Sequence, residues 1–144
     1  MVFDSFASDE ESCDNLLPVV SCSSSTNSSD RGCENLFDGK ITQTVTPWTS
    51  NNDNDWVQLN LAGKYYIKRL KFFKHSYGFS RTLYLQLPDG SGFQHQLKYS
   101  STLDEVILPS TIISNHLNLS IKGPGKIYVE EIQMFGCHAG NTSI

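Results

Sequence analysis

The sequence lacks several features that would place it in a large class of proteins. It has no apolar run near the ~20 residues that cross a bilayer as a helix. Its first residues, MVFDSFASDEESC, have neither the basic start nor the apolar stretch of a signal peptide. The catalytic motifs G-x-S-x-G and H-E-x-x-H and the P-loop are also missing. The length of 144 residues predicts a single domain, and the missing catalytic motifs indicate that it is not an enzyme.

Other groups that could carry chemistry are sparse. The histidines are far apart in the chain, and none neighbours an obvious nucleophile: His75, His95, His116 and His138. Glu130 and Glu131 are adjacent on an expected strand, so they should point to opposite faces and cannot form a facing carboxylate pair. Because no dense basic stripe with stacking aromatic residues is present, nucleic acid is not an expected partner.

Cysteine is scarce, but its pattern is informative. The four cysteines show no C-x-x-C spacing of the kind that zinc and redox sites use. An even number without metal spacing predicts two disulfides in an oxidising compartment, and so a secreted protein or the ectodomain of a cell-surface protein. Three connectivities are possible, and we favour Cys13–Cys137 across the two ends with Cys22–Cys33 closing a short loop. Three N-x-S/T sequons add weak support for secretion and are expected glycosylation sites: Asn27, Asn118 and Asn141.

Charge is distributed unevenly along the chain. The net charge is −4, and five of the fifteen acidic residues lie within residues 1–14, where no Lys or Arg occurs. We expect a flexible acidic arm over 1–14, one domain over 15–138 and a short tail over 139–144. Between Lys64 and Arg81 there are basic residues and no acids. This pattern is typical of a solvated strand face, and alternatively of a patch for an anionic partner.

Alternating apolar and polar residues predict strands throughout the body of the chain. The expected strands are 56–61, 66–73, 82–87, 93–99, 104–108, 116–121 and 126–135, with PSTIIS (109–114) as a separator. The PDGSG segment between the third and fourth strands predicts a hairpin turn. Many short strands with turns rich in Gly, Pro and Asn, and no helical period, predict an all-β sandwich.

Several short motifs occur in an order that resembles a known family. They are NLFDG, TPW, WVQLNL, LYLQLPDGSGFQHQL and VEEIQMFGC, and the resemblance covers residues 18–137. The sequence resembles the discoidin or coagulation-factor C-type domains together with the related carbohydrate-binding modules, which implies a galactose-binding-like jelly roll. The closing strand lacks the Arg of many coagulation-factor C-type domains and looks more like the carbohydrate-binding branch. The spaced His and basic cluster of the fucose lectins is not found, so fucose specificity is not implied.

The resemblance implies a structural calcium ion. Carbohydrate-binding relatives hold calcium near the Asp-Gly turn, and the matching residues here are Asp38, Thr46 and Glu131, with backbone carbonyls of 35–46 completing the shell. Calcium takes six to eight hard oxygen ligands, which such a loop can supply. The alternative is that Asp38 belongs only to a turn and that Glu131 is only an exposed strand acid.

The resemblance also implies binding through loops at one end of the sandwich. The candidate residues are His75, Tyr77, Phe79 and Arg81 in the segment KHSYGFSR, where aromatic faces could stack on a sugar and His and Arg could donate hydrogen bonds. The alternative is an ordinary connection. Trp48 could stack on a sugar, although core anchoring is the simpler interpretation for it and for Trp56. The expected partners are glycans or glycoproteins, and alternatively an anionic phospholipid membrane or a protein receptor.

Overall fold

Two long strands organise the molecule, which we describe from a computed structural model. The structure describes residues 13–25, 33–37, 48–50, 55–74, 81–87, 90–98, 102–122 and 127–139, and it describes 48–50 and 127–128 by their backbone only. The elements are β1 (Asn15–Leu16), β2 (Val19–Ser24), the 3₁₀ helix η1 (Cys33–Phe37), β3 (Trp48–Ser50), β4 (Trp56–Lys74), β5 (Arg81–Gln86), β6 (Gly92–Leu97), β7 (Leu103–Lys122) and β8 (Ile127–His138). No helix in these ranges is long and apolar enough to cross a membrane.

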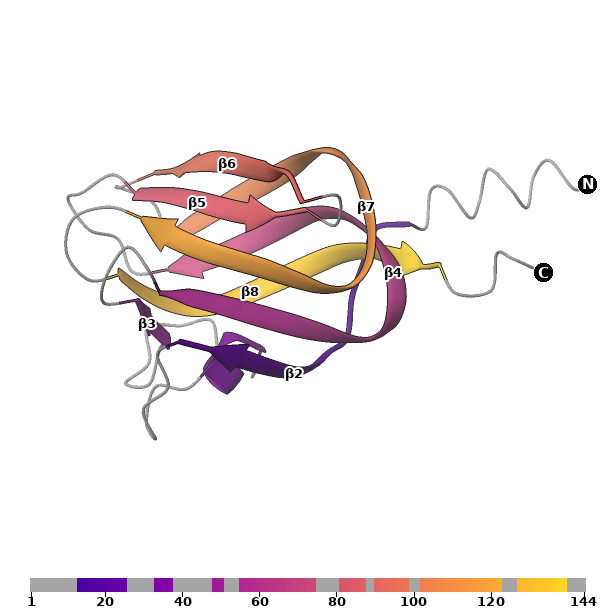
Figure 1. Cartoon of the computed structure of the whole chain (residues 1–144), viewed down its shortest axis with the longest axis horizontal. Coiled ribbons are helices and arrows are strands. Elements are labelled where there is room, and N and C mark those ends of the chain that lie inside the picture. The colour runs from indigo at the N-terminus through magenta and orange to yellow at the C-terminus, as the bar shows by residue number, and fades with distance from the viewer. Residues whose placement is uncertain are drawn as a thin grey trace, which may run out of the picture.

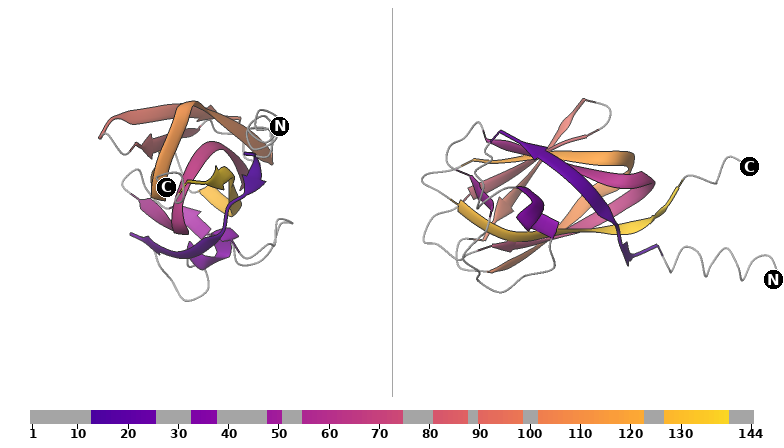
Figure 2. Two further views of the ribbon diagram at one scale, coloured as in Figure 1. Left: turned by 90° about the vertical axis from the view of Figure 1, so that its right-hand side faces the viewer. Right: turned by 90° about the horizontal axis from the view of Figure 1, so that it is seen from below.

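The long strands β4 and β7 each pass through both layers of a sandwich (Figure 1). The first half of β4 pairs with β2 and with the last residues of β7, which in turn pair with β5, and β5 pairs with β6. We call this layer the five-stranded sheet. The second half of β4 pairs with the start of β7 and with β8, whose other edge pairs with β1 and β3. We call this layer the second sheet, and Figure 2 shows the two layers from the end and from below. The predicted all-β jelly-roll sandwich is confirmed.

The separator predicted at 109–114 is wrong, because β7 is continuous from Leu103 to Lys122. The register of β4 against β7 shifts between Asn60 and Tyr65 and again between Ile67 and Arg69. At these shifts the two strands bend together from one layer into the other. A strand that bends at a bulge keeps its overall direction while its ladder is locally interrupted.

The core fills the space between the layers with inward-facing side chains from every long strand. In β4 the alternation holds through Val57, Leu59 and Leu61, and all three are buried. Facing them from the second sheet are Ile132 and Met134 of β8, which are also buried. Burial of such side chains contributes about 1.5–3 kcal/mol each and is the main stabilising term of the fold.

Covalent and charged links close the molecule at its edges. Cys13 pairs with Cys137 and Cys22 pairs with Cys33, which is the connectivity that the sequence favours. Next to the first disulfide, Asp14 forms an ion pair with Arg69 at 2.8 Å. The β5–β6 hairpin turns at Gly90, whose φ of 90° lies in the left-handed region that glycine adopts without strain.

Candidate functional site

One end of the sandwich, which we call the loop end, collects the strand ends that the longer connections join (Figure 1, left). These strand ends are Ser24, Trp56, Lys74, Arg81, Leu97, Leu103, Lys122 and Ile127. β1, the last residues of β8 and the Cys13–Cys137 disulfide lie at the opposite end. The segment 75–80 runs from the end of β4 to the start of β5, so its two anchor points belong to the loop end.

A buried ion pair fixes the base of this end. Lys74, the last residue of β4, lies 3.0 Å from Asp104 of β7, and their side chains are only 4% and 0% exposed. Lys74 Nζ also donates a 2.6 Å hydrogen bond to the carbonyl of Lys98, and the Lys98 amide donates to Asp104 Oδ1 at 3.0 Å. The Lys74 amide donates to the carbonyl of Thr102. These bonds, which we call the Lys74 clasp, join β4 to the chain at the end of β6 and the start of β7.

A second set of bonds holds the start of β4. The Trp56 amide donates to Ser25 Oγ at 2.8 Å, and the Ser25 amide donates to the carbonyl of Trp56 at 3.1 Å. The hydroxyl of Ser25 in turn donates to Asp55 Oδ1 at 3.3 Å, and Asp55 is buried. The end of β2 and the start of β4 are therefore fixed to each other next to segments 26–32 and 51–54.

Buried charge is concentrated at the loop end. The buried charged side chains in the described ranges are Asp55, Lys74, Arg81, Asp104, Glu130 and Glu131, and each belongs to a strand end or to the first residues of β8. Four of these are acids and two are bases. Burying charge is costly unless it is paired or coordinated, so these groups need partners or a bound ion.

The two adjacent glutamates owe their shared burial to an irregularity in the sheet. The register of β4 against β8 shifts between Phe73, which pairs with Glu131, and Lys74, which pairs with Val129. The register therefore passes over Glu130 at that point, and strict alternation is broken. Glu130 and Glu131 are 3% and 5% exposed. The interpretation of Glu131 as an exposed strand acid is wrong.

Comparison with solved structures identifies the fold of this chain. No family model matches the sequence, and no curated protein is similar to it. The CBM32 module of AlyQ, solved in complex with 4,5-unsaturated mannuronic acid, superposes with a TM-score of 0.66 at 14% identity, covering 87% of this chain and 99% of that one. The family 32 module of NanJ from C. perfringens, in complex with galactose, gives 0.62 at 13% identity over 80% and 92%. The chain has the galactose-binding-like fold of the CBM32 modules.

Two further structures extend this comparison. A pectin-binding carbohydrate-binding module superposes with a TM-score of 0.64 at 12% identity, covering 88% of this chain and 94% of that one. A truncated AlyQ that holds both CBM32 and alginate lyase domains gives 0.69 at 13% identity. The match covers 87% of this chain and only 34% of that two-domain protein. The CBM32 fold therefore occurs both alone and joined to an enzyme among these neighbours.

The ligand residues predicted from the sequence fall largely outside the described residues. His75, Tyr77 and Phe79 lie in 75–80, and Trp48 is described by its backbone, which pairs with Val129 at the start of β8. Arg81 is the first residue of β5 and is 4% exposed. In this CBM32-like sandwich Arg81 therefore lies beneath the loop end, and it does not form part of an open surface.

The predicted calcium ligands are partly placed. Asp38 and Thr46 lie outside the described residues, while Glu131 is buried on β8. Helix η1, which ends at Phe37 directly before Asp38, packs against β8. Of the three predicted ligands only Glu131 is described, and its buried carboxylate lies on the strand that η1 contacts and offers the type of oxygen that calcium takes. Among the described residues, one cluster has metal-binding residue types, Cys22, Cys33 and Glu34, but its two sulfurs form a disulfide.

Two residues of the five-stranded sheet, Trp56 and Asn118, do not lie where the sequence predicts. Trp56 is 44% exposed, so the prediction that its ring anchors the core is wrong. Its neighbour Val57 points inward, and alternation directs Trp56 to the outer face. Asn118 is half-buried in the last third of β7, where it pairs with both Gln58 and Gln86, whereas sequons that carry glycans are typically in surface loops. Asn27 and Asn141 lie outside the described residues.

Proposed function

We propose that this chain is an extracellular, non-catalytic recognition module that binds carbohydrate through the loop end. The observation that carries the proposal is the concentration of buried, bonded charge beneath that end, where it fixes the anchor points of the connections. Preorganised loops bind weakly interacting ligands such as sugars with a smaller entropic cost. The CBM32 neighbours, solved with mannuronic acid and with galactose, make a saccharide the first ligand class to test.

Within this proposal, the segment 75–80 supplies the contacts. Tyr77 and Phe79 offer aromatic faces for the C–H side of a sugar ring, and His75 offers a hydrogen bond to a hydroxyl. Arg81, buried at the foot of the segment, fixes its position and supplies positive charge from below. Trp48, next to the start of β8, is a further stacking candidate.

Calcium is the second part of the proposal. Asp38, Thr46 and Glu131 would hold the ion together with backbone carbonyls of 35–46, and its chemistry there is structural, since it would cross-link a loop of low apolar content to β8. The formal excess of acids over bases among the buried described side chains supports a cation at this end. The test is thermal unfolding with calcium and with a chelator. We expect calcium to raise the melting temperature, and Asp38→Ala to abolish that rise; an unchanged rise in the variant would contradict the assignment.

The decisive experiment for function is a glycan-array screen of the oxidised protein with calcium and with a chelator. We expect a defined saccharide hit that Tyr77→Ala weakens at least tenfold. Ile113→Ala is the control, because Ile113 is 49% exposed at the strand bend far from the loop end and its loss should leave binding unchanged. A blank array from folded protein, together with binding to phosphatidylserine vesicles or to a receptor ectodomain, would reject the saccharide proposal in favour of an adhesion domain.

The two disulfides support the proposed extracellular location. Two disulfides with both partners in the folded body persist in an oxidising environment and are rare in the cytosol. We therefore propose glycans or glycoproteins outside the cell as partners. Peptide mapping of the natural protein under non-reducing conditions tests this, because reduced cysteines would contradict an extracellular location.

A further inference from the structure

The outer face of the five-stranded sheet has an unusual chemistry. Its outward side chains in the described ranges are Ser21, Ser23, Trp56, Gln58, Asn60, Thr82, Tyr84, Gln86, Gln94, Gln96, His116, Asn118, Ser120 and Lys122. Amides and hydroxyls dominate this set, it contains no carboxylate, and Lys122 is its one permanent charge. That ammonium lies over the Tyr84 ring at 4.9 Å from the centroid. The second sheet differs, because its outer face carries Arg69 and Lys71 over the Phe135 ring.

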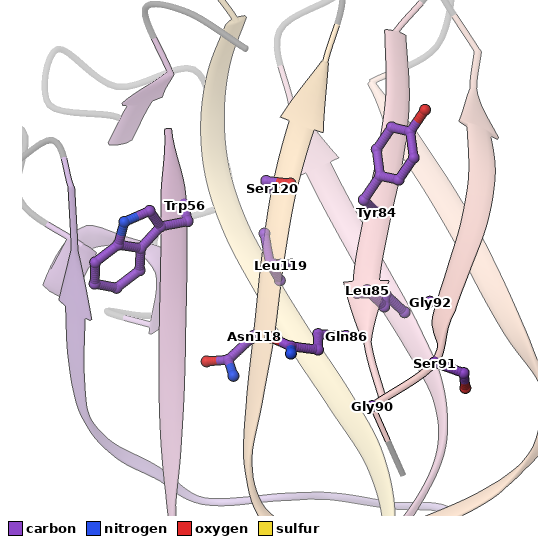
Figure 3. Close-up of a pocket in the computed structure, with 10 residues that line it drawn as sticks. All are labelled: Trp56, Tyr84, Leu85, Gln86, Gly90, Ser91, Gly92, Asn118, Leu119 and Ser120. Carbon is purple, nitrogen blue, oxygen red and sulfur yellow. The ribbon is translucent and has the colours of Figure 1, made fainter. Parts of the chain in front are cut away.

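A trough of about 260 Å³ lies in the middle of this face (Figure 3). Ser120 of β7 is in register with Trp56 of β4 on one side and with Tyr84 of β5 on the other. A small residue between two aromatic residues leaves a hollow over β7. The hollow extends toward the β5–β6 hairpin, where Gly92 offers no side chain.

Two amide side chains in the trough are open to a ligand. Gln58 donates to Asn60 at 2.8 Å and Asn60 donates to Ser21 at 3.0 Å, so the amides nearest β2 are held by one another. Gln86 and Asn118 lie side by side on neighbouring strands (Figure 3). Neither of these two side chains forms a hydrogen bond to another described residue. Each amide offers both donors and an acceptor.

We infer that this trough, which reaches the loop end at Trp56, binds an uncharged saccharide chain through residues other than those of segment 75–80. Sugars present an apolar C–H face and a ring of hydroxyls, which match an exposed indole or phenol ring beside free amides. The volume is slightly below the ~300–1,000 Å³ typical of small-ligand pockets. It therefore suits one ring of a longer chain whose neighbours extend over the flanking glutamines, Gln94 and Gln96.

The charge of the face argues against other occupants. An acidic polysaccharide, a nucleic acid or an anionic membrane needs several cations, since each contact with a phosphate or carboxylate is electrostatic. Lys122 is the one lysine or arginine on this face among the described residues. A peptide would add to an exposed strand edge through main-chain bonds, whereas the trough lies over β7, which is paired on both sides.

The sequon at Asn118 provides a rival occupant that can be tested directly. Asn118 and Ser120 both line the trough, so an N-glycan attached to Asn118 would fill it. Mass spectrometry of the protein secreted from eukaryotic cells decides between the two. Full occupancy of Asn118 by a glycan would overturn the inference, and an unmodified Asn118 supports it.

The binding test is affinity electrophoresis of oxidised protein from a host without N-glycosylation. The gels contain galactomannan, xyloglucan, a mixed-linkage β-glucan or, as the acidic comparison, polygalacturonate. We expect retardation by at least one neutral polymer, with binding about tenfold weaker in Trp56→Ala and about fivefold weaker in Gln86→Ala. Ile107→Ala is the control, because Ile107 is 62% exposed on the second sheet.

The variants separate binding in the trough from binding by segment 75–80. Gln86→Ala alters an exposed polar side chain and should leave the melting temperature unchanged, so its binding loss would not reflect misfolding. Tyr77→Ala should leave retardation by the neutral polymer intact even if it removes glycan-array binding. Absence of retardation in every neutral polymer, or equal retardation of wild type, Trp56→Ala and Gln86→Ala, would overturn the inference without bearing on segment 75–80.

Discussion

The Lys74 clasp provides the sharpest test of how the loop end is held. Asp104→Asn keeps an oxygen that can accept the 3.0 Å hydrogen bond from the Lys98 amide but removes the charge that faces Lys74. The Lys74 ammonium, 4% exposed, then stays buried, keeps the Lys98 carbonyl and loses the Asp104 carboxylate. Breaking one side of a buried ion pair typically costs about 3–5 kcal/mol.

This cost is a large part of the stability of a domain of this size. Against a total of about 5–15 kcal/mol, we expect Asp104→Asn to lower the melting temperature by roughly 10 °C. The assay is thermal and urea unfolding followed by circular dichroism. Glu105→Gln is the matched control: Glu105 is the next residue, its side chain is 49% exposed, and its ion pair with Arg69 should be worth less than about 1 kcal/mol.

A double variant tests the reasoning itself. Lys74→Met combined with Asp104→Asn removes both charges, so it should recover more than half of the loss, apart from about 1 kcal/mol for the Lys98 carbonyl that loses its donor. A single variant within about 3 °C of wild type, or a double variant no more stable than the single one, would refute the account. Because Lys74 directly precedes 75–80, Asp104→Asn should also weaken glycan binding at temperatures where the variant is folded.

Three further changes test other parts of the fold. Gly136→Ala places a Cβ against the Tyr66 carbonyl. We therefore expect the free energy of unfolding, measured in urea, to fall by about 1–3 kcal/mol or more. An unchanged free energy of unfolding would contradict the register of β4 and β8. The hydrogen bond from Arg69 lowers the pKa of Asp14 below its ordinary 3.8. The ion pair therefore stabilises the fold above pH 3.8, and this stabilisation is lost as the pH falls through the lowered pKa. The melting-temperature difference between wild type and Asp14→Asn should therefore be present at pH 7, shrink below about pH 4 and fall with added salt; a constant difference would contradict it. Reduction should destabilise the protein by about 4–5 kcal/mol through the end-to-end disulfide alone, which spans 124 residues.

The inward-facing positions could be predicted from the sequence because strands have a period of two. Val57, Leu59 and Leu61 alternate with polar residues, and the structure buries all three. The predicted separator at 109–114 is wrong because Pro109 does not interrupt β7. This proline lies between Ile107 and Ile112, where β7 changes its register against β4 and a missing amide donor costs no ladder bond.

Trp56 shows two sequence rules in conflict. Large aromatic residues tend to be buried, and the same alternation that buries Val57 directs its neighbour to the other face. The structure follows the alternation. The Lys74 clasp had no local signal at all, because its members are 24 and 30 residues apart in the chain and meet only once the strand registers are set. The bonds that support the loop end could therefore not be predicted from the sequence, and the binding residues of segment 75–80 stay a prediction.

Two binding surfaces on one module would change how it responds to ligand length. A polysaccharide that spans the loop end and the trough meets the second site at a high effective concentration, which raises avidity without new contacts. A double-variant cycle with Tyr77→Ala and Trp56→Ala measures this, because independent sites give additive free-energy losses and linked sites do not. For a long neutral polymer that both sites accept, we expect each single variant to lose most of the avidity, so that the double variant loses less than the sum of the two. For short oligosaccharides of the same sugar, which fill one site at a time, the two losses should be independent. Additivity with the long polymer would show that no single chain reaches both sites, even if each site binds.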